Sequence, residues 1–143
     1  MILPTPPPAW TLHPQLTRDT VMLGDLPLSR VLLVNDENWP WLLLVPRRRD
    51  VCDFIDLDDV EQAQLTTEMT RVARALKAVT ACDKLNIAAL GNVVPQLHVH
   101  VIARREGDAG WPKPIWGAAP AIAYDRQDLE RISAALRRKI WIE

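Results

Sequence analysis

The sequence predicts a single α+β domain, in which one long helix and a C-terminal helix pack on an antiparallel sheet of about five strands. Short runs of large apolar and β-branched residues, separated by turn-forming residues, indicate the strands. A long stretch near the middle of the chain instead repeats apolar residues with helical spacing. With 143 residues, 48% apolar and 24% charged, the chain fits one globular domain over 1–143.

For the first half of the chain, the sequence predicts an extended arm and three strands. Residues 1–9 are rich in proline and are expected to form an extended arm, because proline fixes φ and has no backbone N–H. Strands are expected over 21–25, 30–35 and 41–46, the last two forming an antiparallel hairpin. Their nearly continuous apolar character predicts that a helix covers one face of the sheet and a partner or lid covers the other.

The long helix is expected from about residue 57 to residue 81. Asp56 is predicted to cap its N-terminus, where Asp58 and Asp59 also favour the positive end of the helix dipole. Apolar residues recur at alternating steps of four and three, which places them on one face. This stripe, predicted to lie in the core, consists of Leu65, Met69, Val72, Leu76 and Val79.

For the second half of the chain, the sequence predicts two more strands and a second helix. The strands are expected over 84–90 and 95–103, joined across Gly91-Asn92, a turn that tolerates positive φ and leaves backbone N–H groups free. Glycines and prolines then break any periodicity. Residues 105–143 are therefore expected to form an irregular tail and a C-terminal helix, the latter over about 126–139.

The net charge of the chain limits the classes of partner that it is expected to bind. A formal net charge of −1 argues against a surface that holds polyanions by bulk electrostatics. The basic clusters at 47–49 and 137–139 are too few and too scattered to change this, so no nucleic-acid partner is expected. Any phosphate would therefore be bound locally, by backbone N–H groups and a few side chains.

Cysteine usage and the first residues predict a cytoplasmic protein. Cys52 and Cys82 fit no paired or metal-binding pattern, which favours reduced thiols over a disulfide. The first residues lack the basic and apolar regions of a secretory signal. No apolar run approaches the ~18 residues that a membrane span needs, so no membrane partner is expected.

Two of the three histidines predict a reaction site. His98 and His100 are separated by one apolar residue within an alternating run, so both point to the same face of a strand. An imidazole is well suited to act as nucleophile, acid or base near neutral pH. The alternatives are two polar residues on a solvated strand face, or a pair of metal ligands.

The metal alternative has little support in the sequence. Zinc sites usually have three or four protein ligands. Only His13, Cys52, Cys82 and carboxylates remain to complete such a site, and their spacing matches no known pattern. His13 is more simply read as a turn residue, because the residue before a proline is biased toward an extended conformation. No metal or cofactor is therefore expected.

The histidine segment resembles the signature of the histidine-triad (HIT) superfamily, His-φ-His-φ-His-φ-φ with φ apolar. Gln96 stands in place of the first histidine, and His98 and His100 match the second and third. The resemblance extends over about residues 20–105. It includes the earlier hairpin with Asn35, the long helix, and the order in which Asn86 and the glycine turn precede the histidines. The Trp- and Pro-rich tail looks like a bacterial branch of the superfamily.

This resemblance implies a HIT-like fold and chemistry at the α-phosphate of a nucleotide. His98 falls on the position of the nucleophile, which forms a covalent nucleotidyl intermediate before hydrolysis or transfer. His100 would donate a hydrogen bond to the phosphoryl oxygens, where negative charge develops. The candidate substrates are dinucleoside polyphosphates and nucleoside phosphoramidates.

Further residues would bind the substrate if the resemblance holds. Gly91 and Asn92 would bring backbone N–H groups, and the Asn92 amide, to the same phosphate. Asn35 and Asn86 would bind ribose or phosphate oxygens as neutral donors. Gln96 can still donate and accept hydrogen bonds, although it cannot shuttle a proton.

Two departures from the family pattern bear on activity. Gln96 replaces the outermost histidine, but in the family a backbone carbonyl nearby orients the nucleophile, and that group does not depend on the side chain. Val93 replaces a common serine or threonine, so the protonation of the leaving group lacks its usual hydroxyl. We therefore expect a slow or narrow enzyme, with a non-catalytic nucleotide-binding sensor as the second hypothesis.

A homodimer is expected for three reasons. The family resemblance implies one, and the apolar strands leave a sheet face to be covered. The chain also contains six tryptophans, and exposure of Trp39 or Trp41 would be unusual on a monomer and would fit an interface.

Overall fold

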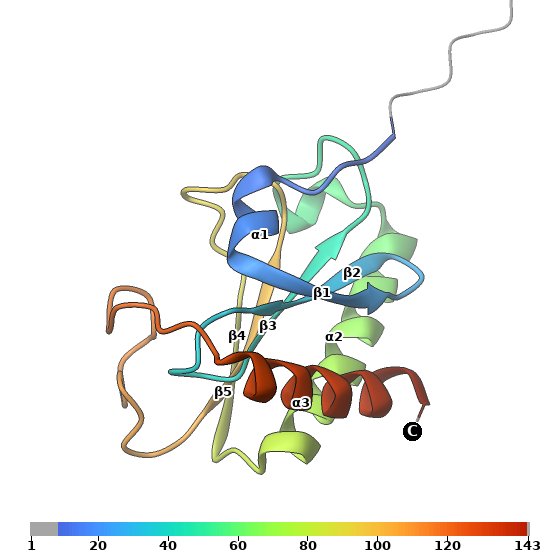
Figure 1. Ribbon diagram of the computed structural model, residues 1–143. Coiled ribbons are helices and arrows are strands. Elements are labelled where there is room, and N and C mark those ends of the chain that lie inside the picture. The colour runs from blue at the N-terminus through green and yellow to red at the C-terminus, as the bar shows by residue number, and fades with distance from the viewer. Residues whose placement is uncertain (1–8, 143) are drawn as a thin grey trace, which may run out of the picture.

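The computed structural model describes residues 9–142 and confirms an α+β domain with a five-stranded antiparallel sheet (Figure 1). The strands are β1 (Thr20–Asp25), β2 (Ser29–Val34), β3 (Trp41–Pro46), β4 (Lys84–Ala88) and β5 (Val99–Arg104). They lie in the order β1-β2-β3-β5-β4, so β5 is inserted between β3 and β4. The expected proline-rich arm lies, apart from residue 9, outside the described residues.

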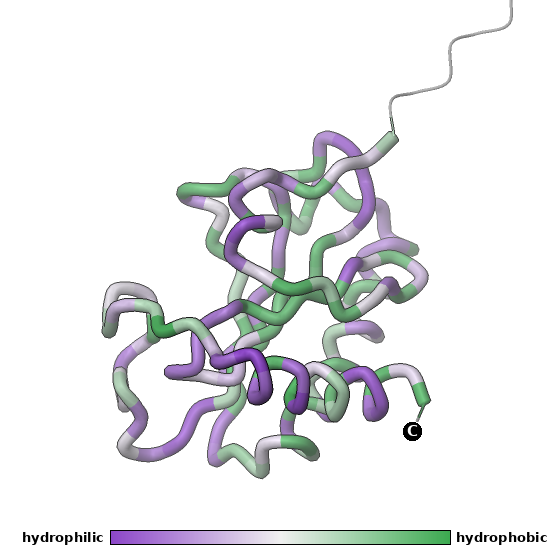
Figure 2. Tube along the Cα trace, in the orientation of Figure 1, coloured by the Kyte–Doolittle hydropathy of each residue, from purple (hydrophilic) through white to green (hydrophobic). Residues whose placement is uncertain are grey.

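The helices lie on both faces of this sheet. They are α1 (Pro14–Asp19), α2 (Asp59–Thr80) and α3 (Arg126–Arg137), with a short 3-10 helix η1 (Phe54–Asp56) and a short π-helix η2 (Arg138–Ile142). Residues of α2 and α3 join one core cluster with one face of the strands, whereas Leu16 of α1 joins a second cluster on the other face. Figure 2 shows the hydrophobic residues concentrated along the central strands. None of the helices in the described part of the chain is long and apolar enough to span a membrane.

The long helix packs as its apolar stripe predicted. Leu65, Val72 and Leu76 are fully buried against the sheet, and the other two members of the stripe pack beside them. The predicted cap, however, was wrong. The N-terminus of α2 is capped by Asp58, whose side chain accepts the Glu61 N–H, whereas Asp56 ends η1 two residues earlier.

The second face of the sheet is covered by segments of this same chain. Trp39 is only 2% exposed and packs with Ile102 and with Ile115 from the tail, and Trp41 is half-buried. Trp39 is therefore not exposed and Trp41 only partly so, and neither tryptophan gives evidence for an interface. Segments that are remote in sequence supply the lid that the apolar strands require.

The boundaries near the histidines also differ from the predicted ones. The strand expected over 95–103 begins only at Val99, so His98 lies immediately before β5 rather than within it. The strand β4 ends at Ala88, two residues earlier than predicted. His100 pairs with Leu43 of β3, which fixes the second histidine in the middle of the sheet.

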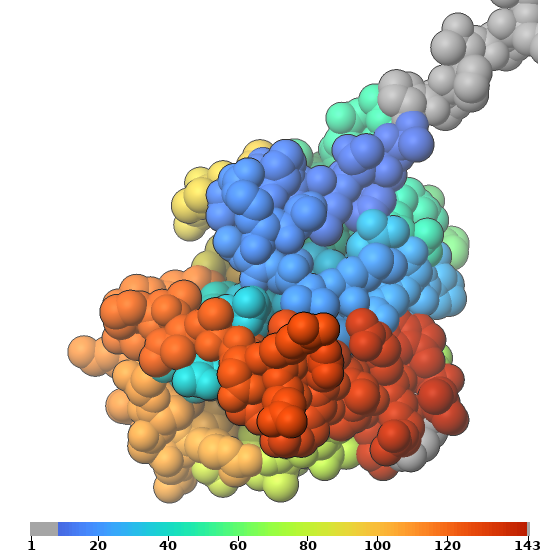
Figure 3. Space-filling view, viewed as in Figure 1, coloured from blue at the N-terminus to red at the C-terminus, as the bar shows by residue number. Residues whose placement is uncertain are grey.

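The tail over 105–124 contains no helix or strand and is held by polar contacts. Arg104, at the end of β5, is 1% exposed and forms an ion pair with Asp108 at 2.8 Å. Further along, the Pro120 carbonyl accepts a hydrogen bond from Asn38. Figure 3 shows this tail, in orange, on the same side of the molecule as α1, in blue.

Candidate active site

The two histidines of the signature line one cavity. This cavity has a volume of about 450 Å³ and is lined by residues of α1, of strands β1, β2, β3 and β5, of the segment between β4 and β5, and of the tail. Val34 and Leu43, which form its floor, face away from α2. The site therefore lies on the sheet face that α1 and the tail cover.

His98 is oriented by the backbone. Its Nδ1 atom lies 2.7 Å from the carbonyl oxygen of Gln96, two residues earlier. Because a carbonyl oxygen only accepts hydrogen bonds, Nδ1 carries a proton in this contact, and the neutral form of the ring has its lone pair on Nε2. The Nε2 atom has no hydrogen-bond partner within the described residues, so it is available to a ligand in the cavity.

His100 is held in a different tautomer from His98. The Trp41 indole N–H donates a hydrogen bond to His100 Nδ1 at 3.0 Å, so the ring must carry its proton on Nε2 when neutral. Burial, and secondarily the nearby His98, lower the pKa of His100 to about 4. The ring is therefore neutral at pH 7. The centroids of the two imidazoles lie 4.9 Å apart.

The glycine turn lies beside the histidines as expected. Gly91 and Asn92 both line the cavity. Gly91 has a φ of 72°, in the left-handed region that favours glycine, and a side chain there would strain the backbone. Val93 follows and is 89% exposed. The loop thus brings Gly91 and Asn92 to the cavity, but it has no hydroxyl at the position of Val93.

Asn35 lies in a neighbouring cavity. That cavity, of about 330 Å³, shares Asp19, Val34 and Trp41 with the histidine cavity. The Asn35 Oδ1 atom accepts the backbone N–H of Tyr124 at 3.0 Å. The two cavities therefore border one another, with the asparagine at one end and the imidazoles at the other.

The remaining two predicted site residues are engaged elsewhere. Asn86 Oδ1 accepts a hydrogen bond from the buried Arg104, and Asn86 lines neither of these cavities. The Gln96 side chain bonds the N-terminal segment, accepting the His13 N–H and donating to the Thr11 carbonyl. The structure thus brings the histidines and the glycine turn together and separates these two side chains from them.

Sequence reasoning missed the first helix and did not single out Trp41 and Trp116 as site residues. Trp41 and Trp116 flank His100, and the ring of Trp116 meets it edge-on with centroids 5.1 Å apart. The helix α1 contributes Gln15 and Asp19 to the cavity. Its one local signal was Pro14 at the first helical position, where a missing N–H costs nothing.

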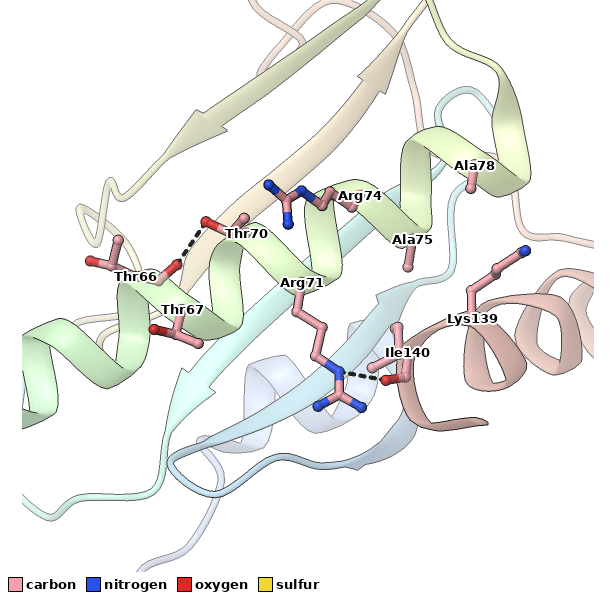
Figure 4. Close-up of a pocket in the computed structure, with 9 residues that line it drawn as sticks. All are labelled: Thr66, Thr67, Thr70, Arg71, Arg74, Ala75, Ala78, Lys139 and Ile140. Atoms are coloured by element: carbon pink, nitrogen blue, oxygen red, sulfur yellow. Dashed lines mark hydrogen bonds between the residues drawn. The ribbon is translucent and has the colours of Figure 1, made fainter. Parts of the chain in front are cut away.

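A larger groove lies elsewhere on the molecule and shares no lining residue with the histidine cavity. It measures about 600 Å³ and runs between α2 and η2, where Arg71 donates a hydrogen bond to the Ile140 carbonyl (Figure 4). The described residues that line it are threonines, alanines, arginines, a lysine and an isoleucine, and none of these supplies an imidazole or a carboxylate for acid–base catalysis. Among the described residues, moreover, no three histidine, cysteine or acidic side chains are grouped so that they could hold a metal ion.

A five-stranded antiparallel sheet that presents paired histidines above a glycine turn defines a histidine-triad-type domain. The model of the HIT domain family matches residues 15–107. An AP-4-A phosphorylase from Mycobacterium tuberculosis is 32% identical over 139 residues, which span 91% of this chain and 70% of that protein. The chain belongs to the HIT domain family.

Solved structures agree with this assignment. A histidine triad protein from Bradyrhizobium japonicum is 63% identical, with a TM-score of 0.92 over 94% of this chain and 100% of that one. A histidine triad protein from Sinorhizobium meliloti is 45% identical, with a TM-score of 0.89 over 91% of this chain and 96% of that one. The family resemblance inferred from the sequence is thereby confirmed.

Proposed function

We propose that this protein is a nucleotide hydrolase or transferase that acts on the α-phosphate through a covalent His98–nucleotidyl intermediate. One observation carries the proposal: the Gln96 carbonyl holds the proton of His98 on Nδ1 and leaves the Nε2 lone pair free at the cavity. A volume of about 450 Å³ is within the range of small-molecule sites. The kinship with an AP-4-A phosphorylase favours a dinucleoside polyphosphate over a nucleoside phosphoramidate.

The proposed reaction has two displacements. His98 Nε2 attacks the α-phosphorus, forming a P–N bond as the bond to the leaving group breaks, and the leaving group departs with the electron pair and takes a proton from solvent. The Gln96 carbonyl stabilises the positive charge on the imidazole by accepting its Nδ1–H. Water or a second acceptor then attacks phosphorus, releases its proton, and breaks the P–N bond to restore neutral His98.

Hydrogen-bond donors would stabilise the charge on the phosphoryl oxygens. His100 is neutral and has its only N–H on Nε2, so it can donate to an oxygen of the α-phosphate. Gly91 and Asn92 line the same cavity, and their backbone N–H groups and the Asn92 amide would donate to the same oxygens. This arrangement uses neutral donors, which suits a chain with little net charge.

The nucleoside would extend toward the second cavity. Asn35 lies there, and the border between the cavities is shared by Asp19, Val34 and Trp41. An aromatic and an aliphatic side chain at this border offer apolar surface for a base. Asn86 and Gln96 are assigned supporting hydrogen bonds rather than direct contact with substrate.

The test is adduct mapping with a dinucleoside polyphosphate labelled at the α-phosphate. We expect an acid-labile label on His98, and loss of both label and turnover in His98→Ala. The matched control is His13→Asn, which removes an imidazole outside the cavity and keeps a side chain able to cap α1. Turnover that survives His98→Ala, or label on another residue, would refute the covalent mechanism.

The second candidate is a nucleotide sensor without catalysis, and Val93 is the observation that favours it. Val93 lines the cavity, is 89% exposed, and has no hydroxyl to assist the leaving group. A sensor would be stabilised thermally by adenosine or guanosine monophosphate and would turn over no substrate in a panel of nucleotides and polyphosphates. Turnover that depends on His98 excludes it.

A homodimer is part of the same proposal. The strand β4 ends the sheet order, so one of its edges has no partner strand among residues 9–142, and Ile87 on it is 47% exposed. An open edge with an apolar side chain favours pairing with a second copy. Light scattering should give twice the mass of one chain, and Ile87→Lys should lower it. A wild-type protein that stays monomeric at high concentration contradicts this part of the proposal.

A further inference from the structure

The ring of His100 is enclosed by aromatic side chains in a way that the family signature does not require. Trp41 lies on one side, with ring centroids 5.7 Å apart, and Trp116 meets the ring edge-on from the tail. Trp41 is itself packed against Trp39 in a T-shaped contact at 6.5 Å. It also sits on β3, which is hydrogen-bonded to the strand that carries His100. The indole is therefore held in place on the same rigid sheet as the imidazole.

In the hydrogen bond between Trp41 and His100, the indole can act only as the donor. An indole N–H can only donate a hydrogen bond, so Trp41 accepts no proton from His100 Nδ1. A hydroxyl or a water at the same place could donate or accept, and would leave both imidazole tautomers available. A donor-only partner removes that freedom, because the tautomer with a proton on Nδ1 would place two N–H groups against each other. The contact selects the tautomer with its proton on Nε2.

We propose that Trp41 is a positioning residue, which fixes His100 in the Nε2–H tautomer so that the ring always presents a donor to the phosphoryl oxygen. This inference rests on the proposed function for its role in the reaction. The tautomer itself is a property of the protein without substrate. Because burial and His98 lower the pKa of His100, the ring stays neutral and the choice of tautomer decides whether it donates.

The two histidines then carry opposite tautomers two residues apart. His98 has its proton on Nδ1, bound to a backbone carbonyl, and His100 has its proton on Nε2, set by an indole. One ring offers a lone pair to phosphorus and the other offers a hydrogen to oxygen. Two identical side chains thus receive different roles because their Nδ1 partners differ, one an acceptor and the other a donor.

The first test is nitrogen NMR of ¹⁵N-histidine-labelled protein without substrate. We expect His100 of the wild type to show one unprotonated Nδ1 and one protonated Nε2. Trp41→Phe keeps an aromatic ring and removes the donor, so both tautomers should become populated. The control is Trp10→Phe, because Trp10 packs on the same apolar cluster as Trp41 and its indole nitrogen has no hydrogen-bond partner in the described part of the chain. It should leave His100 unchanged.

A proton on Nδ1 in the wild type overturns the proposal without any variant, and so does a single unchanged tautomer in Trp41→Phe. Both results are read without turnover, so they are independent of whether the proposed reaction occurs.

The second test is kinetic and uses the dinucleoside polyphosphate that the enzyme hydrolyses. Trp41→Phe should lower kcat by about tenfold and leave KM nearly unchanged, since the missing donor acts on charge that develops in the transition state. In a His100→Asn background the same change should have little further effect on kcat. Equal losses in both backgrounds would mean that Trp41 acts independently of His100, and would overturn the positioning role.

Discussion

The carbonyl oxygen of Gln96 lies 2.7 Å from His98 Nδ1, whereas the Gln96 side chain faces the N-terminal segment. Its Oε1 accepts the His13 N–H at 2.8 Å, and its Nε2 donates to the Thr11 carbonyl at 2.9 Å. The position that replaces the first histidine of the signature therefore has two separate tasks. Its backbone orients the nucleophile, and its side chain holds the segment that leads into α1.

Replacing this side chain should affect stability more than activity. Gln96→Ala removes two hydrogen bonds at the start of the described chain but keeps the carbonyl that orients His98. We expect the free energy of unfolding to fall by about 1–3 kcal/mol, measured by urea denaturation, with only a small loss of kcat. Gln127→Ala, at an exposed position on α3, is the control. A loss of kcat as large as that of His98→Ala would show that the Gln96 side chain takes part in the reaction.

The elements that could be predicted are those in which apolar residues recur at a regular spacing along the chain. The stripe containing Leu65, Val72 and Leu76 predicted the buried face of α2, because a 22-residue helix repeats its pattern many times. The helix α1 has only six residues and buries only Leu16, so no periodicity identifies it. Trp39 could not be placed either, because what buries it is the tail, some 75 residues later in the chain, at Ile115.

In the candidate site, too, some features could be predicted from neighbouring residues, whereas others depend on contacts between residues far apart in the sequence. The spacing of His98 and His100, and the positive φ at Gly91, follow from neighbouring residues and were predicted. The partner of His100 is 59 residues away in sequence and depends on β5 lying beside β3. A sequence pattern contains no such pairing, so Trp41 could be recognised only from the structure. The backbone contact of His98 lies within two residues, and family resemblance had indicated it.

Stability should depend on pH through His100. Its folded-state pKa is lowered to about 4 from an unfolded value near 6.5, so below pH 6.5 the unfolded chain binds more protons than the folded one. The stability associated with the neutral ring is therefore present above pH 6.5 and is lost as the pH falls toward 4. We expect a loss of about 1–2 kcal/mol between pH 7 and pH 5, measured by urea denaturation at each pH.

The variant His100→Asn separates this contribution from other titrating groups. Asparagine keeps an oxygen that can accept the Trp41 N–H, but it does not titrate. The fall in stability between pH 7 and pH 5 should therefore be smaller in the variant than in the wild type. Equal falls in the two proteins would mean that the His100 pKa is not lowered.

The buried ion pair at the start of the tail should be costly to break. Arg104 and Asp108 have side chains that are only 2% and 9% exposed, and the hydrogen bond from Arg104 is the main cause that holds the pKa of Asp108 well below its usual range. Asp108→Asn leaves the guanidinium buried without a counter-charge. We expect a loss of about 3–5 kcal/mol in the free energy of unfolding.

The exposed pair of Arg126 and Glu130 on α3 is the matched control. Its side chains are 93% and 68% exposed, so Glu130→Gln should change stability by at most about 0.5 kcal/mol, because solvent screens the pair. Both variants are compared with the wild type by urea denaturation at pH 7. Similar small changes in the two variants would mean that the Arg104 pair is not a buried one in solution.

Trp116 should govern substrate affinity rather than folding. It comes from the tail, lines the cavity, and is 37% exposed, so its ring is free to contact a ligand while adding little to the core. Trp116→Ala is expected to raise KM for a dinucleoside polyphosphate by about three- to tenfold, with a smaller effect on kcat and little change in melting temperature. Trp116→Phe keeps an aromatic face and should recover most of the affinity. If the alanine variant binds a non-hydrolysable analogue as tightly as the wild type, the tail only packs beside the site and does not form its wall.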